Sequence, residues 1–78
     1  MVNYTITGEK QRISNALVDY VADGYIERNG ENIPCEIGFT EFYSDDLSES
    51  VEIEPTHIFI KDGITDNGTH YEAETIVI

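Results

Sequence analysis

Basic side chains are scarce in this sequence. Four lysines and arginines stand against sixteen aspartates and glutamates, which gives a formal net charge of −12. Residues 29–78 alone carry a net charge of −11, with Lys61 as their one base. A field of this sign opposes binding to DNA, RNA or an anionic leaflet and steers a basic partner toward the protein. We therefore expect neither direct nucleic-acid binding nor membrane binding.

Cysteine and long apolar runs are scarce as well. The one cysteine, Cys35, cannot form an internal disulfide, and no stretch has the pattern of a secretory signal. These absences predict a reducing, cytoplasmic location, which is the host cytoplasm if a phage encodes the chain. The longest apolar runs, Ile58–Ile60 and Ile76–Ile78, are three residues long, against the roughly 20 residues needed to span a bilayer.

Catalytic and metal-binding motifs are also lacking. Residues 45–49 have no glycine for a sharp calcium-binding turn, and residues 62–66 lack the alternating acids and closing glutamate of an EF-hand loop. His57, His70 and Cys35 have no zinc or thiol–imidazole spacing. Cys35 occupies an alternating apolar position, which is typical of a small core residue. We expect no catalytic residue, no metal ligand and no cofactor, and hence no enzyme.

The N-terminal third predicts a strand followed by a helix. Residues 2–7 alternate apolar and polar side chains, as a half-buried strand does. Thr7 is a suitable helix cap, and Gly24 is a suitable residue to end a helix, so we expect one from about Glu9 to Asp23. The apolar stripe of this helix, at helical spacing, consists of Ile13, Ala16, Leu17, Tyr20 and Val21.

The remainder predicts antiparallel strands. Asn29-Gly30 is the signal of a type I′ hairpin between Tyr25–Arg28 and a long strand from Glu31. Further strands are expected at 51–54, at 57–61 after a break at Pro55, and at 69–78. At 78 residues the chain is expected to form one domain, 1–78, with a thin core. The fold class is α+β: one N-terminal helix packed on an antiparallel sheet of about five strands, in the order β-α-β-β-β-β.

The stretch from Glu41 to Glu54 is the candidate binding site, because it holds six carboxylates and no base. We expect an exposed loop at 44–50, followed by a strand whose glutamates face water while Val51 and Ile53 face the core. Same-side residues of a strand are about 6.6–6.8 Å apart, so acids on neighbouring strands would form rows of fixed charge. The candidate residues are Glu41, Asp45, Asp46, Glu49, Glu52 and Glu54, with Glu72 and Glu74 extending the same face.

Rows of fixed negative charge resemble a phosphate backbone to a basic protein. Our first hypothesis is therefore a non-enzymatic inhibitor that occupies the basic groove of a nucleic-acid-binding protein. In size, acidity and expected architecture the chain resembles small phage inhibitors of host nucleic-acid enzymes, including anti-restriction, uracil-glycosylase-inhibitor and anti-CRISPR proteins. Several of those are acidic α+β domains that imitate DNA. This resemblance includes no motif and transfers no functional residue.

A second hypothesis belongs to another class of function. Phe42, Tyr43 and the apolar tail Ile76–Ile78 are suitable contacts for a structural or assembly protein that forms homo-oligomers through a strand edge. In that case the acidity serves solubility, or reflects a halophilic source. A small enzyme ranks last, because so small a core offers little room for a deep pocket.

Overall fold

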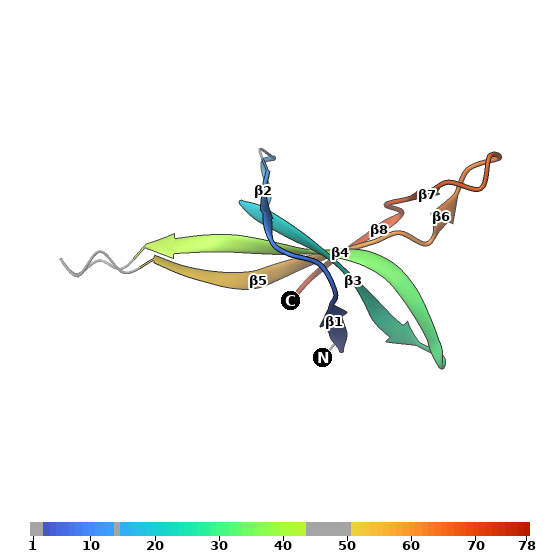
Figure 1. The fold of residues 1–78 in the computed structure, drawn as a ribbon, viewed down its shortest axis with the longest axis horizontal. Coiled ribbons are helices and arrows are strands. Elements are labelled where there is room, and N and C mark those ends of the chain that lie inside the picture. Colours follow the sequence, from blue (N-terminus) through green and yellow to red (C-terminus); the bar gives the residue numbers. More distant parts are fainter. Residues whose placement is uncertain (1–2, 14, 44–50) are drawn as a thin grey trace.

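The computed structural model describes residues 3–13, 15–43 and 51–78, and within these ranges it contains strands and no helix. The expected α+β class, with its N-terminal helix, is therefore wrong, and the described chain is all-β (Figure 1). The strands are β1 (Tyr4–Ile6), β2 (Gln11–Arg12), β3 (Tyr20–Arg28), β4 (Glu31–Tyr43), β5 (Val51–Ile60), β6 (Gly63–Ile64), β7 (His70–Tyr71) and β8 (Glu74–Val77).

Six of these strands form one antiparallel sheet, in the order β1-β3-β4-β5-β8, with β2 paired to β3 beside β1. The strands β6 and β7 pair separately as a small hairpin. The expected turn at Asn29-Gly30 is confirmed: both residues have positive φ, 53° and 80°, and Arg28 pairs with Glu31 across it. This local signal places β3 and β4 in register from the turn onward.

In the described part of 9–23 the structure has β2, residues without regular structure and the start of β3 in place of the expected helix. The side chain of Asn15 accepts hydrogen bonds from the backbone N–H groups of Leu17 and Val18, both at 2.8 Å, and such local bonds compete with helical ones. Tyr20 pairs with Phe39 in the β3–β4 ladder, which holds the end of the expected helix in extended form. An isolated helix of this length is marginal without packing, so the ladder prevails.

Gly24, expected to end that helix, lies inside β3. A Cβ at this position would come within 2.2 Å of the backbone oxygen of Thr5. Gly24 pairs with Ile6 and with Cys35, so the missing side chain lets β1 lie against this part of the sheet. The sequence signal was a glycine, and its use is close backbone approach.

One face of the sheet, here called the core face, buries most of the apolar side chains. In the long strands these residues occupy alternate positions, as the geometry of a strand requires for side chains on one face. The opposite or reverse face has a smaller apolar contact, where a Cβ on Gly38 would lie 2.7 Å from Val18 and 2.8 Å from Phe59. The core-face cluster consists of Ala22, Ile26, Cys35, Ile37, Phe39, Ile58 and Ile60, with Tyr4, Tyr20, Ile33 and Ile76 packed against it.

Pro55 does not break the fifth strand, contrary to expectation. The strand β5 continues through it, and a bulge shifts the register, so that Gly38 pairs with His57 but Phe39 pairs with Pro55. Proline is tolerated because β8 pairs with β5 only from His57 onward, which leaves Pro55 at an edge. The expected last strand, 69–78, is in turn divided into β7 and β8.

Candidate functional site

The sheet has an extension in which only two of its strands remain. Pairing with β3 ends at Phe39, and pairing with β8 ends at His57. Beyond these points Thr40–Tyr43 of β4 pair with Val51–Glu54 of β5 alone. We call this two-stranded part the arm, and Figure 1 shows it extending along the long axis of the molecule.

Two of the candidate carboxylates lie together on the arm. Glu52 and Glu54 are exposed, and they pair with Phe42 and Thr40, so all four side chains share the reverse face. Alternate residues of a strand are about 6.7 Å apart, so the ladder holds the two carboxylates at a fixed separation. No base in the described ranges forms an ion pair with either of them. Their outward orientation is as the sequence indicated.

The expected anchoring of this segment in the core is wrong at Ile53, and the side chain of Val51 is not among those the structure describes. Ile53 lies opposite Glu41 on the other face of the arm, but it is 37% exposed, so it is not a core residue. Two strands alone are too narrow to cover an isoleucine. The arm is therefore held by its backbone ladder and by its polar contacts, and only weakly by burial.

Glu41 lies on the face of the arm opposite to Glu52 and Glu54, and its side chain is only 9% exposed. Its Oε1 accepts hydrogen bonds from the Tyr20 hydroxyl and from Arg12 Nη1, the latter at 2.9 Å, and its Oε2 accepts one from the Tyr43 hydroxyl at 2.7 Å. The hydrogen bond from Tyr20, followed by that from Tyr43 and the charge of Arg12, lowers the pKa of Glu41 below its ordinary value. This acid is compensated internally and adds little free charge.

Asp19 covers the adjoining edge of β4. Its backbone N–H donates to the Phe39 carbonyl at 2.8 Å, and its Oδ2 accepts from the Glu41 backbone N–H at 2.9 Å. Asp19, Arg12 and Tyr20 were not predicted as parts of this region, because all three fell within the expected helix. An alternation of side chains beginning at Tyr20 was the signal available for the true strand.

Glu72 and Glu74 do not extend the acidic face of the arm. Glu74 pairs with Ile60, six residues along β5 from Glu54, which is about 20 Å at 3.3 Å per residue. Glu74 also forms an ion pair with Arg28 at 3.1 Å. The expected rows of four glutamates are therefore not formed.

Glu72 belongs to a different acidic group, around Lys61. Lys61 Nζ lies 3.3 Å from Glu36 and 4.0 Å from Asp23. A hydrogen bond with Glu36 raises the pKa of Glu72, and the same bond lowers the pKa of Glu36. The remaining three candidates, Asp45, Asp46 and Glu49, lie outside the described residues.

The contact residues of the assembly hypothesis are partly available. Phe42 is 45% exposed and lies beside the arm glutamates, and Tyr43 is 71% exposed although its hydroxyl is engaged by Glu41. In the C-terminal tail, Val77 and Ile78 are exposed, whereas Ile76 is half-buried against the core.

Cys35 and the histidines do not form a reactive group. Cys35 is a buried core residue, as expected, and burial raises the pKa of its thiol to about 11. His57 Nδ1 lies 2.9 Å from Thr56 Oγ1, and His70 Nδ1 lies 3.1 Å from the Lys61 carbonyl. Among the residues that the structure describes, no group of three His, Cys, Asp or Glu side chains is arranged to hold a metal.

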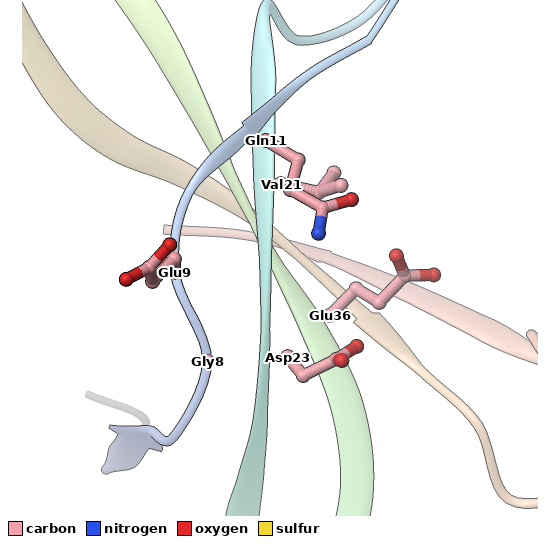
Figure 2. A pocket seen from close by; sticks show the side chains of 6 residues that line it. All are labelled: Gly8, Glu9, Gln11, Val21, Asp23 and Glu36. Atoms are coloured by element: carbon pink, nitrogen blue, oxygen red, sulfur yellow. The ribbon is translucent and has the colours of Figure 1, made fainter.

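A hollow of about 280 Å³ lies on the reverse face, between β3 and the segment that joins β1 to β2. In the view of Figure 2 the carboxylate of Glu9 points away from those of Asp23 and Glu36. The acids that line the hollow therefore do not converge on one point, and Lys61 already compensates two of them. Its lining consists of Gly8, Glu9, Gln11, Val21, Asp23 and Glu36.

Comparison with protein-family models, curated proteins and solved structures finds no match. The function proposed below therefore depends on the chain's own residues. A search of the described residues for a helix with the length and hydropathy of a membrane span finds none.

Proposed function

We propose that this chain is a small non-enzymatic binding protein, of the inhibitor type, that docks its arm in the basic groove of a nucleic-acid-binding protein. The observation that carries the proposal is the placement of Glu52 and Glu54. Both are exposed, both lie on one face of the arm, and the β4–β5 ladder fixes their separation. A basic groove that binds phosphates would also attract two negative charges held at a fixed separation on a protein whose net charge is −12.

The distribution of bases supports the arm as the docking region. Arg12, Arg28 and Lys61 all form ion pairs with acids outside Glu52 and Glu54. The fourth base, Lys10, lies over the ring of Phe39, 5.0 Å from its centroid. None of the four bases therefore neutralises Glu52 or Glu54, and the charge of both is available to an external partner. We place this partner in the cytoplasm, because a single buried thiol suits a reducing compartment.

Exposed Phe42 supplies an apolar contact beside the two charges, since it lies opposite Glu52 on the same face of the arm. Aromatic residues are enriched at the centre of protein interfaces, where they bury a large area, and arginine or lysine side chains pack favourably on their faces. A basic groove that receives Glu52 and Glu54 would therefore also receive Phe42. Electrostatic attraction then accelerates association, and the aromatic contact slows dissociation.

The test compares two variants with the same net charge. Glu52→Gln/Glu54→Gln removes two charges from the arm, and the matched control Glu27→Gln/Glu31→Gln removes two from the exposed β3–β4 hairpin. Each is immobilised and used to capture proteins from the native host's lysate at low and high salt, with mass spectrometry of the retained proteins and elution by a DNA duplex. We expect a DNA-binding protein retained by wild type and control, lost with the arm variant, and released by salt or duplex. Equal retention by the arm variant would contradict the proposal.

The exposed tail supports a second candidate function. Val77 and Ile78 are 72% and 55% exposed, and β8 is the outer strand of the sheet, so two copies would bury this apolar edge by pairing through β8. Size-exclusion chromatography at high salt distinguishes the candidates. Assembly through β8 predicts that the wild-type chain is an oligomer at high salt and that Val77→Lys is a monomer. The inhibitor proposal predicts that both proteins are monomers.

A further inference from the structure

The two edges of the arm are unequal, and the difference identifies how a partner would bind. In an antiparallel strand, successive residues direct their backbone N–H and C=O groups to opposite sides. On β4, the Phe39 carbonyl and the Glu41 N–H both point away from β5, and Asp19 satisfies both. The β4 edge of the arm is therefore closed at this position.

The outer edge of β5 has no partner among the described residues at the corresponding place. Ile53 is opposite Glu41, and since the groups of Glu41 point away from β5, those of Ile53 point away from β4. No described residue donates to or accepts from Ile53 on that side. Within the described residues, pairing along this edge of β5 is seen as far as Thr56, whose carbonyl accepts from the Ile78 N–H at 2.9 Å. The next residue, Pro55, has no N–H with which to continue the ladder.

We propose that this edge, Glu52–Glu54, accepts an extended basic segment of the partner as an additional β-strand. The proposal rests on the function proposed above and specifies its binding mode. An added strand would pair with the outward N–H and C=O of Ile53, which no described residue engages, and its side chains would alternate between the two faces of the arm. The residues flanking the one opposite Ile53 would then lie beside Glu52 and Glu54. The geometry selects a basic–apolar–basic sequence.

Charge decides between this occupant and a second copy of the chain. An antiparallel pair of two copies centred on Ile53 would set Glu52 of one copy opposite Glu54 of the other. Directly opposed side chains have Cβ atoms about 4.5–5.5 Å apart, and like charges there are destabilising. A strand with lysine or arginine at those positions replaces the repulsion with attraction, and the apolar residue between them covers half-exposed Ile53.

The experiment uses two peptides of equal charge. Acetyl-Lys-Val-Lys-Val-Lys-amide can form a strand, whereas acetyl-Lys-Pro-Lys-Pro-Lys-amide lacks the necessary N–H groups. Each is titrated into the ¹⁵N-labelled chain while amide hydrogen exchange is followed by NMR. We expect the first peptide to slow the exchange of the Ile53 N–H about tenfold or more, as a new hydrogen bond does, and the second to leave it unchanged. The Glu52 N–H, which faces β4, is the internal control and should not change.

A chemical variant isolates the hydrogen bond from the charges. The 78-residue chain is short enough for chemical synthesis, so Ile53 can be N-methylated while Glu52 and Glu54 are kept. We expect the affinity of the N-methylated chain for the first peptide to be lower than that of the wild-type chain by about tenfold or more. Equal, salt-sensitive binding of both peptides, unaffected by methylation, would overturn strand addition but leave the inhibitor proposal standing. Self-association that methylation abolishes would assign the edge to a second copy and also overturn the inference. No binding of either peptide would overturn it as well, and the lysate capture above would still decide the inhibitor proposal independently.

Discussion

Acidic and apolar side chains have different surroundings in the body of the sheet and in its arm. In the body, where β3, β4, β5 and β8 lie side by side, Asp23 and Glu36 flank Lys61, and Glu74 pairs with Arg28. On the arm, Glu52 and Glu54 have no described ion pair, and even Ile53 is partly in solvent. In the body, the neighbouring strands supply the basic partners of the acids and bury the apolar side chains. Acidity in the sequence is therefore not the same as charge available to a partner.

The sharpest form of this comparison uses two isoleucines of β5. Ile58 is fully buried in the body, whereas Ile53 on the arm is 37% exposed. We expect Ile58→Ala to lower the free energy of unfolding by about 2–5 kcal/mol, and Ile53→Ala by less than about 1 kcal/mol, because only the first leaves a cavity. Urea unfolding followed by circular dichroism measures both. Equal losses would mean that the arm is as well packed as the body.

The second comparison concerns two glutamates of the arm itself. Glu41→Gln removes the charge that Arg12 pairs with and weakens the bonds from Tyr20 and Tyr43. We expect a clearly lower midpoint of thermal unfolding, whereas Glu54→Gln should change stability by no more than about 0.5 kcal/mol, as exposed sites usually do. Calorimetry at pH 7 and low salt compares the two. A stable Glu41→Gln protein would show that the network contributes little.

Acid should remove the contribution of Glu41. Its folded-state pKa is lowered, so it stabilises the fold above its ordinary pKa of 4.5, and this contribution is lost as the pH falls through the folded-state value. The difference in unfolding free energy between wild type and Glu41→Gln should therefore shrink below about pH 4.5. Urea titrations from pH 7 to pH 3 follow this difference. A constant difference would exclude the charge as its source.

The smallest effect is expected at Glu72, and its sign is opposite. The hydrogen bond with Glu36 raises the folded-state pKa of Glu72, so its contribution is present in acid and lost as the pH rises through that value. Glu72→Gln keeps a hydrogen-bond donor without the charge. We expect it to be more stable than wild type at pH 7, by about half a kcal/mol or less because the site is exposed, and equal to it near pH 4. A less stable variant at pH 7 would contradict this account.

Local signals in the sequence predicted some of the fold correctly. Asn29-Gly30 specified its turn because both residues accept positive φ, and Ile33, Cys35 and Ile37 were placed on one face by simple alternation. The first strand and the hairpin were found for the same reason. The exposure of Glu52 and Glu54 followed from the same alternation in β5.

The prediction of a helix at 9–23 was wrong because it also depended on neighbouring residues alone. Ile13, Ala16 and Leu17 have helical spacing, but the extended form of Tyr20 and Val21 depends on Phe39 and Gly38, almost twenty residues away. The predicted strand break at Pro55 was wrong for the same reason, since a proline breaks a central strand but is tolerated at an edge. Which strands are edges is not written in any short stretch.

By itself, the sequence determined the net charge, the type I′ turn and which side chains alternate along each strand, because these depend on composition and on neighbouring residues. Only the tertiary structure decided that Glu41 is held by Arg12, Tyr20 and Tyr43 while Glu52 and Glu54 stay exposed. It also decided that Asp19 closes one edge of the arm, whereas no described residue pairs with the other edge at Ile53. Those outcomes depend on which strands become neighbours, and strand order is set by long-range pairing that brings distant charges and backbone groups together.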